Sequence, residues 1–79
     1  MAFYIQMVKL ADDGRHVDYS FGTGTDVGVV RWARRTNTIS IVSPCPLDDA
    51  AGRWALRAQW KLARLASAGT FPQLTEWAS

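Results

Sequence analysis

The sequence predicts an α+β domain: a four-stranded, mostly antiparallel sheet packed on one face by a long helix near the C-terminus (ββββα). Four β-rich segments come first, and each ends in a turn-forming cluster or at prolines. One long stretch of strong helix formers follows, from Asp48 to Ala68. A chain of 79 residues is expected to form one domain, spanning positions 1–79.

The strands are expected to form two hairpins. Gly14 ends a turn cluster between the first two strands, and Asn37 is the expected residue of positive φ between the last two. Pro44 and Pro46 end the fourth strand because neither residue can donate to a sheet ladder. The four expected strands are residues 3–10, 16–22, 27–33 and 38–43.

The expected helix has a capping residue at each end and one apolar stripe. Asp48 is a favourable N-cap, and Gly69 lies where a C-terminal cap belongs. After Gly69 we expect a short tail or a final helix opening near Pro72, with Leu74 and Trp77 on one side. At about 100° per residue, the stripe that faces the sheet contains Ala51, Trp54, Ala55, Ala58, Leu62, Leu65 and Ala66.

The opposite face of the helix has two large apolar residues in a polar setting. Leu56 and Trp60 are four residues apart, so their side chains are neighbours on that face. Three interpretations remain open: the C-terminal tail covers them, two copies pack helix to helix, or another protein binds there. The flanking cations are Arg53, Arg57, Lys61 and Arg64.

Charge is polarised along the chain, although the net charge is only +2. Residues 1–30 contain two cations and four aspartates, a balance of −2, whereas residues 31–64 contain seven cations and two aspartates, a balance of +5. Such asymmetry indicates the kind of partner and does not bear on the fold. It favours a partner with an acidic surface.

Few residues are candidates for catalysis or metal binding. His16 and Asp18 fall on one face of an expected strand, but no nucleophile accompanies them. Cys45 lies between two prolines and is expected to be a packing residue, and one Cys with one His cannot form a structural zinc site. The glycine-rich segment 22–28 leads into a strand, unlike a phosphate-binding loop. We expect no enzymatic activity, metal or cofactor.

The sequence also predicts a cytoplasmic protein that does not enter a membrane. No apolar run reaches the roughly 18 residues of a membrane span. Residues 1–6 lack the basic start and long apolar run of a signal peptide.

The predicted function is a small, non-catalytic interaction or inhibitory module, similar in size and style to compact immunity proteins. It would bind an acidic protein surface through Arg53, Leu56, Arg57, Trp60, Lys61 and Arg64.

The alternative is a small nucleic-acid-binding domain that combines the helix cations with the hairpin residues Arg31, Arg34 and Arg35. A homodimer is also possible, because a sheet covered by one helix leaves a second face open. The apolar residues expected on that face are Tyr4, Val8, Val29 and Val42.

Overall fold

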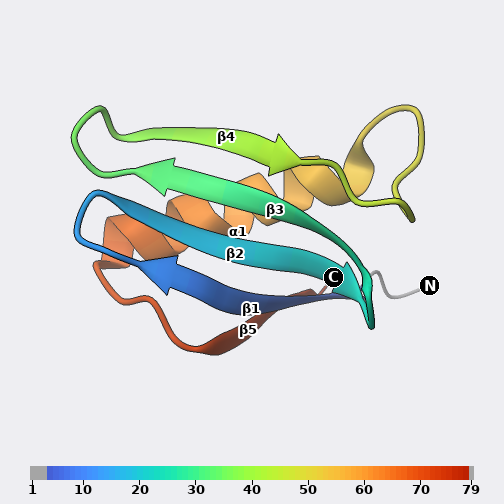
Figure 1. The fold of residues 1–79 in the computed structure, drawn as a ribbon, viewed down its shortest axis with the longest axis horizontal. Helices are drawn as coiled ribbons and strands as arrows, with labels where there is room; N and C mark the ends of the chain where they lie inside the picture. The colour runs from blue at the N-terminus through green and yellow to red at the C-terminus, as the bar shows by residue number, and fades with distance from the viewer. Residues whose placement is uncertain (1–3, 79) are drawn as a thin grey trace.

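A computed structural model describes residues 4–78 and contains one five-stranded antiparallel sheet and one helix (Figure 1). The strands lie in the order β4-β3-β2-β1-β5, and α1 crosses one face of the sheet. The one helix of the described segment is too short and too polar to cross a membrane. The elements are β1 (Tyr4–Asp12), β2 (His16–Thr23), β3 (Asp26–Ala33), β4 (Thr38–Ser43), α1 (Arg53–Ala68) and β5 (Leu74–Ala78).

The α+β class and the antiparallel meander of the first four strands are confirmed. Each strand pairs with the next one along the chain, so that Tyr19 in β2 lies between Lys9 in β1 and Val30 in β3. Asn37 has φ 52°, as predicted for the turn between β3 and β4. Phe3, which the sequence assigned to the first strand, lies outside the described residues.

The helix begins later than predicted, at Arg53, although Asp48 still caps it. Gly52 is the N-cap residue with φ 69°, a left-handed conformation that other residues adopt only with strain. The chain therefore turns at Gly52, which leaves Asp48 close to the first turn of the helix. The Asp48 carboxylate accepts hydrogen bonds from the N–H groups of Trp54 and Ala55, both at 3.0 Å. These groups have no partner within the helix, so Asp48 satisfies them from outside it.

The prediction of a short final helix is wrong, because residues after Gly69 continue into a fifth strand. β5 pairs antiparallel with the edge of β1, with Val8 opposite Leu74 and Ile5 opposite Trp77. The spacing of three residues between Leu74 and Trp77 suggested one side of a helix, but in a strand it places them on opposite faces. Without the tail, β1 would have an unpaired edge, and the tail pairs with that edge. No local pattern in the tail reveals that this edge is available.

The hydrophobic core lies between α1 and the sheet. Most of the predicted helix stripe is confirmed: Ala58 and Leu62 are fully buried, and Trp54 is partly buried against the core. Ala51 precedes the helix and is exposed, contrary to the prediction. The buried hydrophobic residues of the core are Ile5, Met7, Val17, Tyr19, Phe21, Val30, Trp32, Cys45, Ala58 and Leu62.

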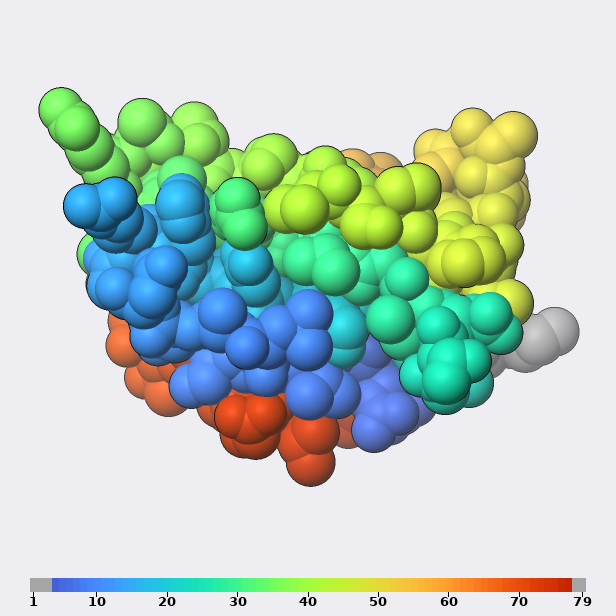
Figure 2. Space-filling view, viewed as in Figure 1, coloured from blue at the N-terminus to red at the C-terminus, as the bar shows by residue number. Residues whose placement is uncertain are grey.

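No element within residues 4–78 covers the second face of the sheet, and α1 is almost entirely hidden behind the strands when that face is viewed directly (Figure 2). Strand alternation places Tyr4, Val8, Val29 and Val42 on this open face, as the sequence predicted. Tyr4 and Val42 are 57% and 50% exposed. The structure thus leaves two different surfaces available, one on the outside of α1 and one on the open face.

Candidate functional site

The outer side of α1 displays Trp60 and Leu56, which are 49% and 43% exposed. The Trp60 ring packs against Trp77 of β5, with ring centroids 5.8 Å apart and planes tilted by 51°. Two other tail residues do not cover this face: Phe71 stacks on Trp32, and Leu74 lies on the open face of the sheet. The C-terminal tail therefore contacts Trp60 without enclosing it.

The predicted cations surround these two residues along the same helix. Arg53 pairs with Asp49 at 3.4 Å, and Arg57 Nη1 donates a hydrogen bond to the Arg53 carbonyl at 3.3 Å. The Arg64 guanidinium lies 5.9 Å from the centre of the Trp77 ring, within cation–π range. Together with Trp77, the predicted partner-binding residues form the helix-face patch: Arg53, Leu56, Arg57, Trp60, Lys61, Arg64 and Trp77.

Trp77 is the member of the patch that the sequence did not assign to the binding site, although the tail residues Phe71, Leu74 and Trp77 were considered as a cover for Leu56 and Trp60. Its position in β5 places it on the helix side of the sheet, opposite the buried Ile5. From there its ring contacts Trp60 and Arg64 at once, and its indole N–H is buried without a hydrogen-bond partner in residues 4–78. No local signal identified it, because Leu74-Thr75-Glu76-Trp77 reads apolar–polar–polar–apolar and lacks the alternation of a strand with one buried face.

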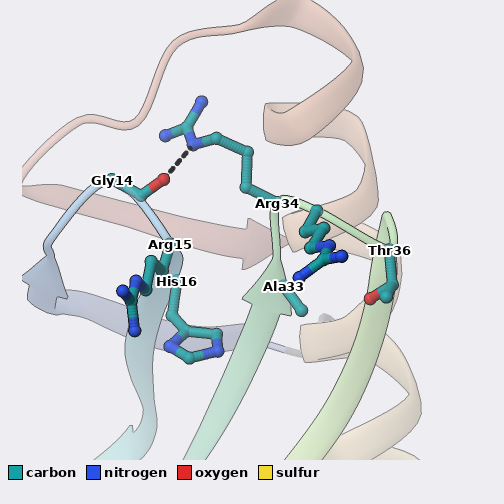
Figure 3. A pocket seen from close by; sticks show the side chains of 7 residues that line it. Gly14, Arg15, His16, Ala33, Arg34 and Thr36 are labelled. Atoms are coloured by element: carbon teal, nitrogen blue, oxygen red, sulfur yellow. Dashed lines mark hydrogen bonds between the residues drawn. The ribbon is translucent and has the colours of Figure 1, made fainter.

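A second basic site lies at the end of the sheet where two turns meet. The β1–β2 and β3–β4 turns border an open cavity of about 580 Å³ (Figure 3). Strands of a meander place alternate turns at the same end of the sheet, so Arg15 joins the predicted Arg35 there. Neither guanidinium has an ion pair within the described chain. The lining residues are Gly14, Arg15, His16, Ala33, Arg34, Arg35 and Thr36.

Two of the three hairpin arginines already have protein partners. Arg31 binds Asp18 through two hydrogen bonds of 2.8 and 3.0 Å, and this bonding raises the pKa of Arg31. Arg34 donates to the Gly14 carbonyl at 3.0 Å (Figure 3) and lies 3.6 Å from Asp12.

These partners hold Arg31 and Arg34 on opposite sides of the sheet. Arg31 projects from the open face, which is the side of the sheet away from α1. The Arg34 guanidinium lies over Trp32, 5.0 Å from the ring centre, on the helix side. Arg31 and the helix cations therefore lie on opposite sides of the sheet, whereas Arg34 shares the side of α1.

Two of the candidate catalytic residues, Asp18 and Cys45, have side-chain partners. Both Asp18 oxygens accept hydrogen bonds from Arg31, and in the described part of the chain no hydrogen bond or ion pair joins Asp18 to His16. The Cys45 thiol is buried and donates to the Asp26 carbonyl at 3.3 Å, consistent with its predicted packing role. Among residues 4–78 no group of three or more metal-ligating side chains comes together.

Searches against protein-family models, curated proteins and solved structures found no match to this chain.

Proposed function

We propose that this chain is a small interaction module that binds an acidic protein surface through the helix-face patch. The observation that supports this proposal is the half-exposed Trp60 ring, held against Trp77 and surrounded by cations. Trp and Arg are the residue types that most often dominate binding energy in protein interfaces. Leu56, exposed one turn before Trp60, extends the apolar centre.

The patch combines charge with a preorganised anchor. Because Trp77 supports one side of the Trp60 ring, binding would immobilise a side chain that is already restrained, at a lower entropic cost. The surrounding arginines and Lys61 would accelerate encounter with an acidic partner, and this effect would weaken as salt increases. Asp49 pairs with Arg53 at 3.4 Å at the edge of the patch.

Nucleic-acid binding is the alternative, and the structure supports it less. Arg31 and Arg34 are held by Asp18, Asp12 and Gly14, and Trp32 is only 8% exposed, so it offers no stacking surface to a base. Arg15 and Arg35 are left to contact a phosphate backbone at the end of the sheet. Two arginines alone would give only a shallow salt dependence.

The proposal is tested with Trp60→Ala. The chain is immobilised as bait, a co-purifying protein is identified, and its affinity for both chains is measured by calorimetry. We expect binding to weaken roughly 30-fold, since a central Trp often contributes 2 kcal/mol or more. Stability should change little, because half of the ring is already in water.

The control is Leu47→Ala, which removes a side chain of similar exposure (44%) from the connection between β4 and α1. It should leave the affinity unchanged. Equal capture by wild type and Trp60→Ala would contradict the proposal. So would a fall in the melting temperature of about ten degrees in Trp60→Ala, which would make Trp60 a core residue. Steep salt-dependent retention on heparin would favour the nucleic-acid alternative.

A further inference from the structure

We infer that the open face of the sheet is a surface on which two copies of this chain pack sheet to sheet. The inference is independent of the helix-face patch, which lies on the other side of the molecule. Six apolar residues share the open face, and three of them, Tyr4, Val42 and Leu74, are at least 50% exposed. These residues are called the open-face patch: Tyr4, Val8, Val27, Val29, Val42 and Leu74.

The register of the sheet makes the centre of this patch continuous. Leu74, Val8, Ser20 and Val29 are direct neighbours across β5, β1, β2 and β3. A bulge where β4 pairs with β3 adds Val42 at the far edge. Ser20, the polar member of the row, is only 7% exposed, and its hydroxyl donates to the Val8 carbonyl at 3.5 Å. The Ser20 hydroxyl would therefore keep its hydrogen-bond partner if a second copy covered this row.

The charges of this face favour a second copy over a charged partner. Asp18 and Arg31 neutralise each other at 2.8 Å, so the central part of the face has no unpaired charge. Polar side chains flank the central row: Gln6 and Glu76 pair directly beside it, between it and Tyr4, and His16 lies toward the other end of the face. An apolar centre with a polar border is the usual composition of an interface. A second copy supplies the same neutral, apolar surface.

The size of the face fits a weak dimer. Five strands at ~4.8 Å spacing, averaging about seven residues at ~3.3 Å each, give a face of roughly 20–25 Å by 24 Å. Two such faces together would bury about 1,000 Å², near the lower limit for a specific interface. Stacked sheets pack about 10 Å apart with their strands within about 30° of each other. The dimer would therefore form and dissociate over an accessible range of concentration.

Such packing would leave α1 on the outside of each copy. The dimer would have four layers, helix–sheet–sheet–helix, with the two helix-face patches pointing in opposite directions. Two identical sites on opposite sides would bind a repeated or surface-attached partner with avidity. The proposed dimer is thus different from helix-to-helix packing, which would bury Leu56 and Trp60.

The experiment is sedimentation equilibrium of the full chain over a wide range of concentration. We expect the mass to rise from 8.8 kDa toward twice that value. Leu74→Lys and Val42→Lys each place a charge at an exposed position of the patch, and each should weaken dimerisation at least tenfold. Leu56→Lys is the matched control on the helix face, and it should leave dimerisation unchanged. Far-ultraviolet circular dichroism confirms that each variant is folded.

A second measurement locates the interface directly. In a mixture of isotope-labelled and unlabelled chains, filtered NOE spectra should show contacts between copies at the methyl groups of Val8 and Val29. A monomer at every concentration overturns the inference and assigns the open face to another protein or to lipid. A dimer that only Leu56→Lys disrupts also overturns it and indicates helix-to-helix packing.

Discussion

Tyr19 shows how one residue connects distant parts of this fold. Its ring is fully buried in the central strand β2, and its hydroxyl donates to the Pro72 carbonyl in the connection between α1 and β5. The two residues are 53 positions apart in the chain. Burial raises the pKa of Tyr19 from 10.0 to about 12, because the charged phenolate would lose its hydration there.

This shift predicts a loss of stability at alkaline pH. Below pH 10 Tyr19 is protonated in both the folded and the unfolded state, so its ionisation does not affect stability. As pH rises from 10 to 12 the unfolded chain releases the proton first, and the free energy of unfolding should fall by up to roughly 3 kcal/mol. The measurement is chemical denaturation at several pH values in this window.

The control for the alkaline effect is Tyr19→Phe. It should cost about 1–2 kcal/mol at neutral pH, since the Pro72 carbonyl loses its donor. Between pH 10 and 12 it should lose less stability than the wild type, because the other titrating groups are common to both chains. Parallel pH profiles for the two chains would refute the assignment to Tyr19.

At the scale of single elements, α1 depends on a loop residue that lies outside it. Gly52 allows the chain to turn sharply into the helix but has no side chain that can cap it. The Asp48 carboxylate performs this role from four residues earlier, accepting the N–H groups of Trp54 and Ala55. A negative charge at this end of a helix also interacts favourably with the helix dipole.

We therefore expect Asp48→Ala to destabilise the protein by about 1–2 kcal/mol, the usual cost of losing an N-terminal cap. Asp49→Ala is the comparison, because Asp49 accepts only the Arg53 N–H, at 3.2 Å, and forms an exposed ion pair. Exposed pairs contribute little, so its effect should be smaller. Urea denaturation measures both, and an equal or larger effect at Asp49 would show that Asp48 is not the principal cap.

For the whole molecule, the last nine described residues join the helix layer to the sheet. Phe71 stacks on Trp32 with ring centroids 5.3 Å apart, and its carbonyl accepts a hydrogen bond from Lys9 Nζ at 3.0 Å. Gln73 then bonds to Lys9 through both main chain and side chain, and Trp77 follows on β5 against the core. The tail is therefore an integral part of the domain.

A chain that ends at Gly69 should fail to fold. A domain of this size has only roughly 3–5 kcal/mol of net stability, and burial of large side chains such as Phe71 and Trp77 contributes about 1.5–3 kcal/mol each. Near-ultraviolet circular dichroism and a two-dimensional amide NMR spectrum should show an unfolded chain. Leu74→Ala is the control: this side chain is 62% exposed, so the full-length variant should stay folded. Dispersed amide signals from the shortened chain would show that β5 is dispensable.

Local sequence patterns determined the meander, the turn at Asn37, the end of α1 at Gly69, and the side chains of α1 that face the sheet. They also placed Leu56 and Trp60 on the outer side of the helix and Tyr4 and Val42 on the open face. These features follow from turn chemistry and from periods of 2 and 3.6 residues, which neighbours in the sequence control.

Only the tertiary structure decided that the tail becomes β5, that Trp77 supports Trp60, and that Arg31 is bound by Asp18. Each of these depends on groups far apart in the chain. An unpaired edge of β1 stabilises whichever segment returns to it, and the tail's own pattern does not reveal which edge is free. Local propensity therefore determined the individual surfaces of this protein, whereas long-range pairing decided which side chains on them have partners.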